Sequence, residues 1–438
     1  MELKKYKLGD IAEILISSID KKSKEGESPV RLCNFVDVYH NWAITADMVS
    51  NFMEATTSEK NIDRFSLKKG YVAFTKDSET RDDIGVPTYI AEDLDNTVLG
   101  YHCALVKPDE SIILGKYLNA FLHSDYIKRY FELNATGSGM RYTLSVDTLY
   151  NIPILAPSLD IQKRIGDLFS NIDRKICINR SLNHYLEAMA KQLYDYWFVQ
   201  FDFPDENGKP YKSSGGKMVW NDKLKREIPE GWNIASLHSF IKDTKSGDWG
   251  KDDPDKGLMK VSCIRGADIN DLNNLPVRYI SDKHKDRLLS KGDVVIEISG
   301  GSPIQATGRI ALITDGVLRR NNYNVICSNF CHCYVLNNTL YTEYFYYLWK
   351  SLYDNGNMFN YEGKTSGIKN FIADAFLANY WFVPEESLVE RFHKAIKTFQ
   401  LLKDKLIEEN NILLAEREEL LPLLITGQVS IKQLNNDL

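Results

Sequence analysis

The chain has 438 residues, with 54 Lys and Arg against 60 Asp and Glu, so its formal net charge is −6. At about 150 residues per domain, this length indicates two or three domains. The acidic balance excludes a uniformly basic DNA-coating protein, although clustered basic residues could still bind DNA locally.

The seven cysteines are scattered and odd in number, which argues against a disulfide framework and favours a reducing compartment. The first ten residues, MELKKYKLGD, lack the apolar stretch of a signal peptide. The apolar run at 420–425 is too short to span a bilayer. We therefore expect a cytoplasmic protein without membrane contact.

Residues 1–157 have the pattern of a globular domain of mixed α/β class. Strands are predicted at 71–74 and 102–106, and a helix at 114–133. Glycines let a backbone approach a phosphate and Arg suits a guanine edge, so polar clusters of these residues are candidate DNA contacts. An ordinary surface loop is the alternative. The candidates here are Lys76, Arg81, Ser138, Gly139, Arg141 and Tyr142.

A long helix is predicted over 158–200, and a basic linker over 201–231. The linker contains Pro204, Pro210 and Pro229, together with several glycines, which are typical of irregular structure. Between 207 and 226 it carries six basic residues against one acid, Asp222.

Residues 232–385 are predicted to form a second mixed α/β domain. Strands are expected at 294–298, 309–313 and 324–327, and a helix at 340–353. A glycine-bearing polar loop at 364–370 and the Arg-Arg-Asn-Asn run at 319–322 are candidate DNA contacts on the same reasoning. The candidates are Arg309, Arg319, Arg320, Asn322, Lys364, Ser366, Lys369 and Asn370.

A second long helix is predicted over 386–426, with a tail at 427–438. Both long helices carry apolar residues in the alternating four- and three-residue steps of a coiled-coil seam. Each stripe contains one Asn at a matching step, Asn179 and Asn410, which would fix the helix–helix register at some cost in stability. In the alternative, each helix packs only against its own domain. The seam residues predicted in the first helix are Ile161, Ile165, Leu168, Ile172, Lys175, Asn179, Leu182, Leu186, Met189, Leu193 and Tyr196.

The chain contains an internal repeat. The segment 67–72 resembles 289–294, and 138–141 resembles 366–369, each about 220 to 230 residues later. Pro157 and Pro384 precede the two long helices at a similar spacing. We therefore predict an α/β (α+β) fold in which a domain-plus-helix unit occurs twice, related by a pseudo-two-fold repeat.

No motif for catalysis emerges. Cys327, Cys331, His332 and Cys333 invite comparison with a zinc site, but no second ligand pair accompanies them and buried cysteine is a common apolar residue. The eight histidines show no metal-binding or nucleophile-activating spacing. We expect no catalytic residues, no metal site and no enzymatic activity in this chain by itself.

Four segments carry a resemblance to a known family. They are 189–203 (MAKQLYDYWFVQFDF), the linker 204–232, the strand segments 292–298 with 308–313 (GDVVIEI and GRIALI), and 420–429 (LLPLLITGQV). The chain resembles the specificity subunit of type I restriction–modification systems. The resemblance covers essentially the whole chain, and the first domain is its least typical part.

The resemblance implies two target-recognition domains separated by two long antiparallel helices, each domain reading one half of a bipartite site in double-stranded DNA. The helices would set the spacer and dock two modification subunits, which methylate adenine with S-adenosylmethionine. Restriction subunits, using ATP and Mg, would add translocation and cleavage. The chain itself would hold no cofactor. Because the two domains differ in sequence, we expect an asymmetric target.

Two other functions compete with this interpretation. The first is a coiled-coil adaptor that binds proteins and not DNA, and the second is an enzyme with an unrecognised active site. Sequence-specific binding of DNA by the assembled complex would favour a specificity subunit over the adaptor. Activity of the purified chain alone would establish the second.

Overall fold

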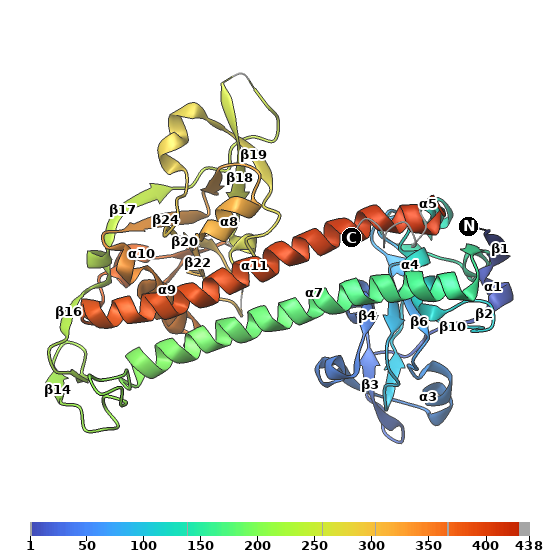
Figure 1. The fold of residues 1–438 in the computed structure, drawn as a ribbon, viewed down its shortest axis with the longest axis horizontal. Helices are drawn as coiled ribbons and strands as arrows, with labels where there is room; N and C mark the ends of the chain where they lie inside the picture. The colour runs from blue at the N-terminus through green and yellow to red at the C-terminus, as the bar shows by residue number, and fades with distance from the viewer. Residues whose placement is uncertain (1, 138, 256, 303, 366–367, 429–438) are drawn as a thin grey trace. The chain divides into compact units, whose positions relative to one another are not determined.

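The computed structural model describes residues 2–137, 139–255, 257–302, 304–365 and 368–428. Its contacts divide the chain into two compact units, Met1–Ile178 with Asn410–Leu438, and Asn179–Glu409. The long helices α7 (Leu159–Tyr194) and α11 (Glu386–Ile425) each contribute residues to both units. They are the green and red helices of Figure 1. Each unit is described by itself below.

The first unit is built on a five-stranded sheet with the order β2-β10-β6-β8-β4 (Figure 1). Neighbouring strands are antiparallel except β4 and β8, which are parallel. The predicted strands at 71–74 and 102–106 are confirmed as two of its members. The bounds are β2 Ala12–Ile16, β4 Ala43–Ile44, β6 Val72–Thr75, β8 Pro87–Ile90 and β10 Cys103–Pro108.

Both faces of this sheet are buried, which explains why its central strands are apolar at consecutive positions. On β10, Ala104 and Val106 face a core shared with α4 (Gly115–Leu122) and α5 (Asp125–Asn134). The alternate residues Cys103 and Leu105 face a second core. That core is shared with a three-stranded sheet of the order β5-β3-β9, in which β3 and β9 are parallel (β3 Ser28–Cys33, β5 Met53–Thr57, β9 Thr97–Leu99).

The single helix predicted at 114–133 is wrong, because the structure breaks it into α4 and α5. Ser124 has an extended backbone between them, and its hydroxyl donates a hydrogen bond of 2.6 Å to the carbonyl oxygen of Phe121. A side-chain hydrogen bond to the preceding turn competes with helix continuation. The break lets Phe121 and Phe131 enter the same core from two helices.

The glycine-bearing segment at 136–142 forms a β-hairpin instead of an open loop. Its strands β11 (Thr136–Gly137) and β12 (Tyr142–Thr143) pair with each other, and β12 also pairs with β7 (Asp77–Ser78). We call this three-stranded sheet the first hairpin sheet. The remaining elements of the unit are β1 Lys4–Lys7 paired with β13 Pro153–Ala156, α1 Leu8–Ile11, α2 Phe35–His40, α3 Glu59–Phe65 and α6 Val146–Tyr150.

The second unit repeats this topology, except that its main sheet has four strands and lacks a counterpart of β4. Its main sheet has the order β17-β24-β20-β22, a second sheet has the order β19-β18-β23 with β18 and β23 parallel, and β16 pairs with β27. The internal duplication predicted from the sequence is therefore confirmed in the strand order. The bounds are β16 Asn233–Ser236, β17 Ile241–Ser246, β18 Leu258–Ile264, β19 Val277–Ser281, β20 Val294–Glu297, β22 Ile310–Leu312, β23 Val325–Cys327, β24 Cys331–Leu336 and β27 Tyr380–Val383.

The hairpin recurs as well. In this second hairpin sheet, β26 (Ile368–Phe371) pairs with β25 (Glu362–Thr365) and with β21 (Ser299–Gly300), which follows β20 directly. The predicted helix at 340–353 is confirmed as α9 (Thr342–Asp354), preceded by a short 3-10 turn. The two short helices are α8 (Asp315–Arg320) and α10 (Ala373–Leu377).

The cysteines near 330 belong to the core. Cys331 and Cys333 lie on one face of β24 and are fully buried with Cys327 among Ile264, Val295 and Ile313. Among the residues that the structure describes, no group of three or more His, Cys, Asp or Glu could hold a metal ion. These cysteines therefore act as small apolar residues.

The predicted linker at 201–231 is ordered. It contains a hairpin of β14 (Met218–Asn221) and β15 (Arg226–Pro229), and Phe201 is buried in the core of the second unit. The ring of Phe203 stacks at 5.4 Å on Trp232, and the Arg226 guanidinium lies 4.8 Å from the Phe201 ring. The segment contains several prolines and glycines, but as a whole it packs against the second unit.

The long helices are antiparallel within the second unit. The ring of Tyr194 lies 6.2 Å from that of Phe392, whereas Asn179, fifteen residues earlier on α7, donates a hydrogen bond of 2.7 Å to Glu409, seventeen residues later on α11. Residue numbers therefore rise along one helix as they fall along the other. α7 ends in one π-helical turn, Asp195–Val199.

The seam predicted for α7 is only partly right. Ile165, Ile172 and Asn179 are buried as predicted, but the intervening positions of the seam are Phe169 and Ile176 in place of Leu168 and Lys175. In the second unit Ala190 and Tyr194 are buried, whereas the predicted Leu182, Met189 and Tyr196 are exposed. The helix carries two adjacent apolar stripes, and packing against the globular part selects one of them. None of the helices in the described residues is long and apolar enough to cross a bilayer.

Candidate nucleic-acid interface

The first hairpin sheet brings the described candidates of the first unit together. Lys76 precedes β7, Arg141 precedes β12, and Gly139 lies exposed at the hairpin tip with a positive φ of 59°. The Arg81 guanidinium lies 5.3 Å from the centre of the Tyr142 ring. Residues far apart in sequence thus form one basic surface. The remaining candidate of this group, Ser138, lies outside the described residues.

Asp77 is at the centre of this surface. Lys76 Nζ lies 3.0 Å from one carboxylate oxygen, and His102 Nδ1 contacts the other. A guanidinium nitrogen of Arg141 lies 3.6 Å from the second oxygen and 2.8 Å from His102 Nε2. Burial alone would raise the pKa of Asp77, but hydrogen bonds from Thr143, His102 and Lys76 outweigh it and lower the pKa. The carboxylate is therefore a stable anchor for the side chains of Lys76, His102 and Arg141.

A pocket of about 470 Å³ opens beside these residues. The rings of Phe35 and Tyr39 stack at 5.8 Å on one side of the anchor, and Tyr39 donates a hydrogen bond of 2.7 Å to Asp83. Both rings line the pocket together with Met140, Arg141 and His102. Stacking surfaces next to a guanidinium are suited to nucleic-acid bases.

The second hairpin sheet carries a simpler arrangement. Lys369 Nζ lies 2.8 Å from Glu362, which also accepts a 2.8 Å hydrogen bond from the backbone N–H of Thr307. Burial would raise the pKa of Glu362, but these hydrogen bonds lower it. Asn370 contacts the hydroxyl of Ser299 at 2.5 Å on the neighbouring strand β21. Ser366 and the side chain of Lys364 lie outside what the structure describes.

Arg309 does not belong to this surface. It forms a two-pronged ion pair with Glu297, at 2.9 and 2.6 Å, and both side chains are largely buried. The strand β22 that begins at Ile310 carries it into the sheet interior. A paired and covered guanidinium is not offered to DNA, so its prediction as a contact is corrected to a structural role.

Arg319 and Arg320 face the long helix α11 instead of the second hairpin sheet. Arg319 lies 3.0 Å from Glu408, and Arg320 lies 2.7 Å from Asp404 with only 7% of its side chain exposed. These two candidates hold α8 on α11, a role that their sequence could not reveal because the partners lie more than eighty residues away. Asn322 is exposed beyond α8.

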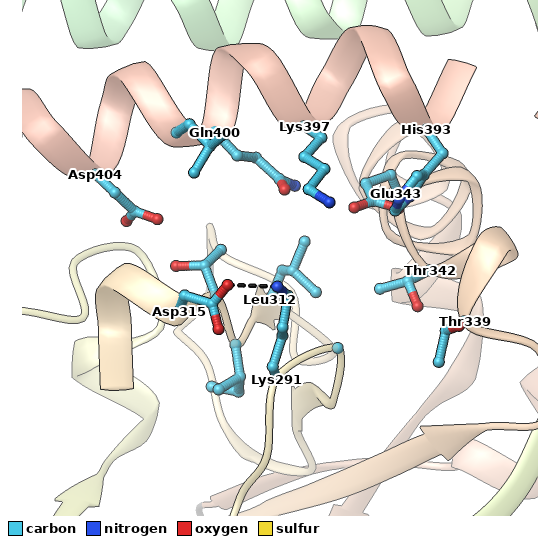
Figure 2. A pocket seen from close by; sticks show the side chains of 14 residues that line it. Lys291, Leu312, Asp315, Thr339, Thr342, Glu343, His393, Lys397, Gln400 and Asp404 are labelled. Atoms are coloured by element: carbon cyan, nitrogen blue, oxygen red, sulfur yellow. Dashed lines mark hydrogen bonds and ion pairs between the residues drawn. The ribbon is translucent and has the colours of Figure 1, made fainter. Parts of the chain in front are cut away.

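A second pocket, of about 280 Å³, lies between α11 and the globular part of the second unit (Figure 2). His393, Lys397 and Asp404 reach it from α11, and an ion pair of Lys291 with Asp315 closes the opposite wall. Burial raises the pKa of Glu343, which contacts His393 at 2.5 Å. Charges of both signs alternate around this pocket, so it does not present the cationic surface that a phosphate backbone needs.

Sequence reasoning missed Asp77, His102 and Glu362. Each is a polar residue at the edge of a strand, where hydrophobic periodicity carries no signal. His102 has a positive φ of 68°, which is uncommon for a residue other than glycine. The local sequence does not predict this backbone conformation. Only the pairing of β7 with β12 brings Asp77 beside Arg141, and only the pairing of β25 with β26 brings Glu362 beside Lys369.

Comparison with known proteins shows similarity to one kind of protein. The family model for the type I restriction modification DNA specificity domain matches residues 1–188. The MjaIX specificity subunit of Methanocaldococcus jannaschii is 24% identical over 351 residues, which cover 74% of this chain and 71% of the relative. The HindI specificity subunit of Haemophilus influenzae is 28% identical over 200 residues, 45% of this chain and 41% of the relative.

The chain is similar to type I restriction–modification specificity subunits. The fold agrees with this. The crystal structure of the type I specificity subunit from M. genitalium covers 97% of this chain and 96% of its own, with a TM-score of 0.54 at 15% identity.

Proposed function

We propose that this chain is the DNA-specificity subunit of a type I restriction–modification complex, in which each unit reads one half of an asymmetric bipartite site. The observation that carries the proposal is the duplicated hairpin sheet. The first presents Arg141 beside Asp77, and the second presents Lys369 beside Glu362. Two homologous surfaces with different side chains are what an asymmetric target requires.

The division of labour in the proposed complex follows the relatives. This chain is non-catalytic and holds no cofactor. Two modification subunits supply S-adenosylmethionine-dependent methylation of adenine, and restriction subunits supply translocation and cleavage with ATP and Mg. The complex works in the cytoplasm. The domain limits predicted at 157, 200, 231, 385 and 426 are part of this proposal.

A face of α7 offers a docking site for a modification subunit. Leu182, Tyr185 and Met189 follow one another at three- and four-residue steps, so they lie on one side of the helix, and all three are exposed. Exposed apolar residues that form a contiguous stripe mark interaction surfaces. An adaptor without DNA binding would use the same stripe, so the decisive test concerns DNA.

The test is co-expression of this chain with its cognate modification subunits in a host that lacks adenine methylation, followed by sequencing for N6-methyladenine. We expect one bipartite motif with two different half-sites and a fixed spacer. Modification subunits expressed without this chain are the control and should give no motif. Methylation that is absent, or identical with and without this chain, would contradict the proposal and favour the adaptor.

A further inference from the structure

The arrangement around Asp77 goes beyond what DNA contact alone needs. The Asp77 side chain is only 12% exposed and contacts Lys76, His102 and Arg141, whereas the Arg141 side chain is 59% exposed. Lys76 also donates a hydrogen bond of 2.8 Å to Thr143 on β12. One side of the Arg141 guanidinium is thus tied to a buried network, and the rest projects from the hairpin.

A tethered guanidinium has a restricted direction. Arg has five N–H donors in a rigid, planar arrangement. When some of them contact Asp77 and His102, the direction of the remaining donors is fixed. Guanine presents O6 and N7 as a pair of acceptors in the major groove, and a two-donor contact to them is the commonest specific contact of Arg. A free Arg on a flexible loop would serve a phosphate equally well, because a phosphate accepts from many directions.

The second unit repeats the device with other residues. Glu362 is largely buried, contacts Lys369 at 2.8 Å and is itself held by the Thr307 backbone. Lys369 lies on the strand that corresponds to β12, and 22% of its side chain is exposed. In both copies of the fold a buried carboxylate lies beside a cation at the middle strand of the hairpin sheet, although Asp77 is on β7 and Glu362 is on β25, the counterpart of β11. This recurrence indicates a shared role in place of a chance ion pair.

We propose that Asp77 and Glu362 are positioning residues for sequence reading: Asp77, with His102, aims Arg141 at a guanine in one half-site, and Glu362 aims Lys369 at a guanine in the other. This inference rests on the proposed function. It adds which side chains read, which carboxylates hold them, and which base they select.

The experiment uses the whole complex and its methylation motif. In Asp77→Asn, the Arg141 tether loses its charge, so the guanine preference at one position of one half-site should fall roughly tenfold or more. The other half-site and the spacer should not change. Glu362→Gln should give the reciprocal result, so each variant is the control for the other. Asp125→Asn, at a highly exposed carboxylate of the first unit, is the matched control and should change nothing.

Arg141→Gln provides a second test that leaves the buried carboxylate in place. It should relax the same position as Asp77→Asn, and the assembled complex should still form. Full complex assembly measured by size-exclusion chromatography excludes a folding defect in either variant.

Three results would overturn the inference. The first is a wild-type motif that neither Asp77→Asn nor Arg141→Gln alters. The second is a uniform loss of methylation at all sites, which would make Arg141 a phosphate contact. The third is relaxation of both half-sites by one substitution. If the wild-type complex gave no motif at all, the proposed function itself would fail, which is a distinguishable outcome.

Discussion

Glu187 shows at the residue scale how charge can outweigh burial. It lies on α7 and contacts Lys350 of α9 at 2.7 Å and Lys403 of α11, so one carboxylate joins three helices of the second unit. Burial alone would raise the pKa of Glu187, but the charges of Lys403 and Lys350 lower it to about 2. The folded state therefore prefers the ionised form.

This shift makes a prediction about pH. A carboxyl group whose pKa is lower in the folded state stabilises that state above its unfolded pKa, near 4.5, and loses the contribution as the pH falls toward 2. Glu187→Gln should lower the free energy of unfolding by about 3 kcal/mol at pH 7, because two lysines lose their partner. Urea unfolding at pH 7 and at pH 3 measures the difference, which should shrink at the lower pH.

A surface carboxylate provides the comparison for this prediction. Glu390 pairs with Lys394 on the exposed side of α11, and Glu390→Gln should leave the free energy of unfolding almost unchanged at either pH. Equal losses for Glu187→Gln and Glu390→Gln would show that the Glu187 contacts contribute no more than a solvated ion pair.

At the scale of the element, α7 has to serve two neighbours at once. Its buried stripe, through Ile165, Phe169, Ile172 and Ile176, packs within the first unit. The exposed stripe that contains Leu182, Tyr185 and Met189 remains available for a partner. The same helix therefore supplies a core stripe and, in the proposed function, a docking face from an adjacent seven-residue pattern.

The docking face yields a prediction. Leu182→Lys combined with Met189→Lys should weaken co-purification of the modification subunits at least tenfold, because two charges enter an apolar contact. Thermal stability of the lone chain should hardly change, since both positions are exposed. Ser181→Lys, one position off the stripe, adds a charge beside it and should leave assembly intact. Undiminished co-purification of the double variant would place the docking face elsewhere.

The length of the long helices yields another prediction. Deleting seven residues from each, 173–179 of α7 and 409–415 of α11, removes about two turns, or about 10 Å, and keeps the seven-residue repeat in phase. If the two helices set the spacer between the half-sites, this spacer should shorten by about three base pairs at 3.4 Å each. Methylation mapping measures the spacer, and both half-site sequences serve as internal controls. An unchanged spacer would mean that the helices do not set it.

At the scale of the whole molecule, the net charge of −6 has a structural explanation. Six acidic residues against three basic ones lie between 403 and 419 on α11. Two of these acids, Asp404 and Glu408, are matched by Arg320 and Arg319 of the second unit. Two of the six acids of this stretch therefore serve packing between the helix and the globular part, away from the hairpin sheets that would face DNA.

The charge balance predicts weak DNA binding by the isolated chain. Each hairpin sheet carries few cations, and part of each charge is already paired, so few phosphate counterions would be released. Fluorescence anisotropy with a duplex that contains the target should give an affinity at least tenfold lower for the lone chain than for the complex at the same salt. Comparable affinities would show that this chain supplies most of the phosphate contacts itself.

The duplication, the class of fold and the placement of the long helices could all be predicted from the sequence. Repeated segments such as 67–72 and 289–294, and apolar steps of three and four, are local signals that survive without knowledge of distant contacts. The same signals predicted most strands correctly. These signals could not predict which of two neighbouring stripes on α7 is buried, because both stripes are apolar.

The pairing of the cations with distant acids could be read only from the three-dimensional structure. Arg320 and Arg141 are equally basic in sequence, but Arg320 is buried on Asp404, eighty-four residues away, whereas Arg141 projects beside Asp77 and His102. An ion pair depends on where distant segments meet, and strand pairing sets that meeting point. The physical reason is that charge, unlike hydrophobic periodicity, leaves no repeating pattern along the chain from which its partner could be read.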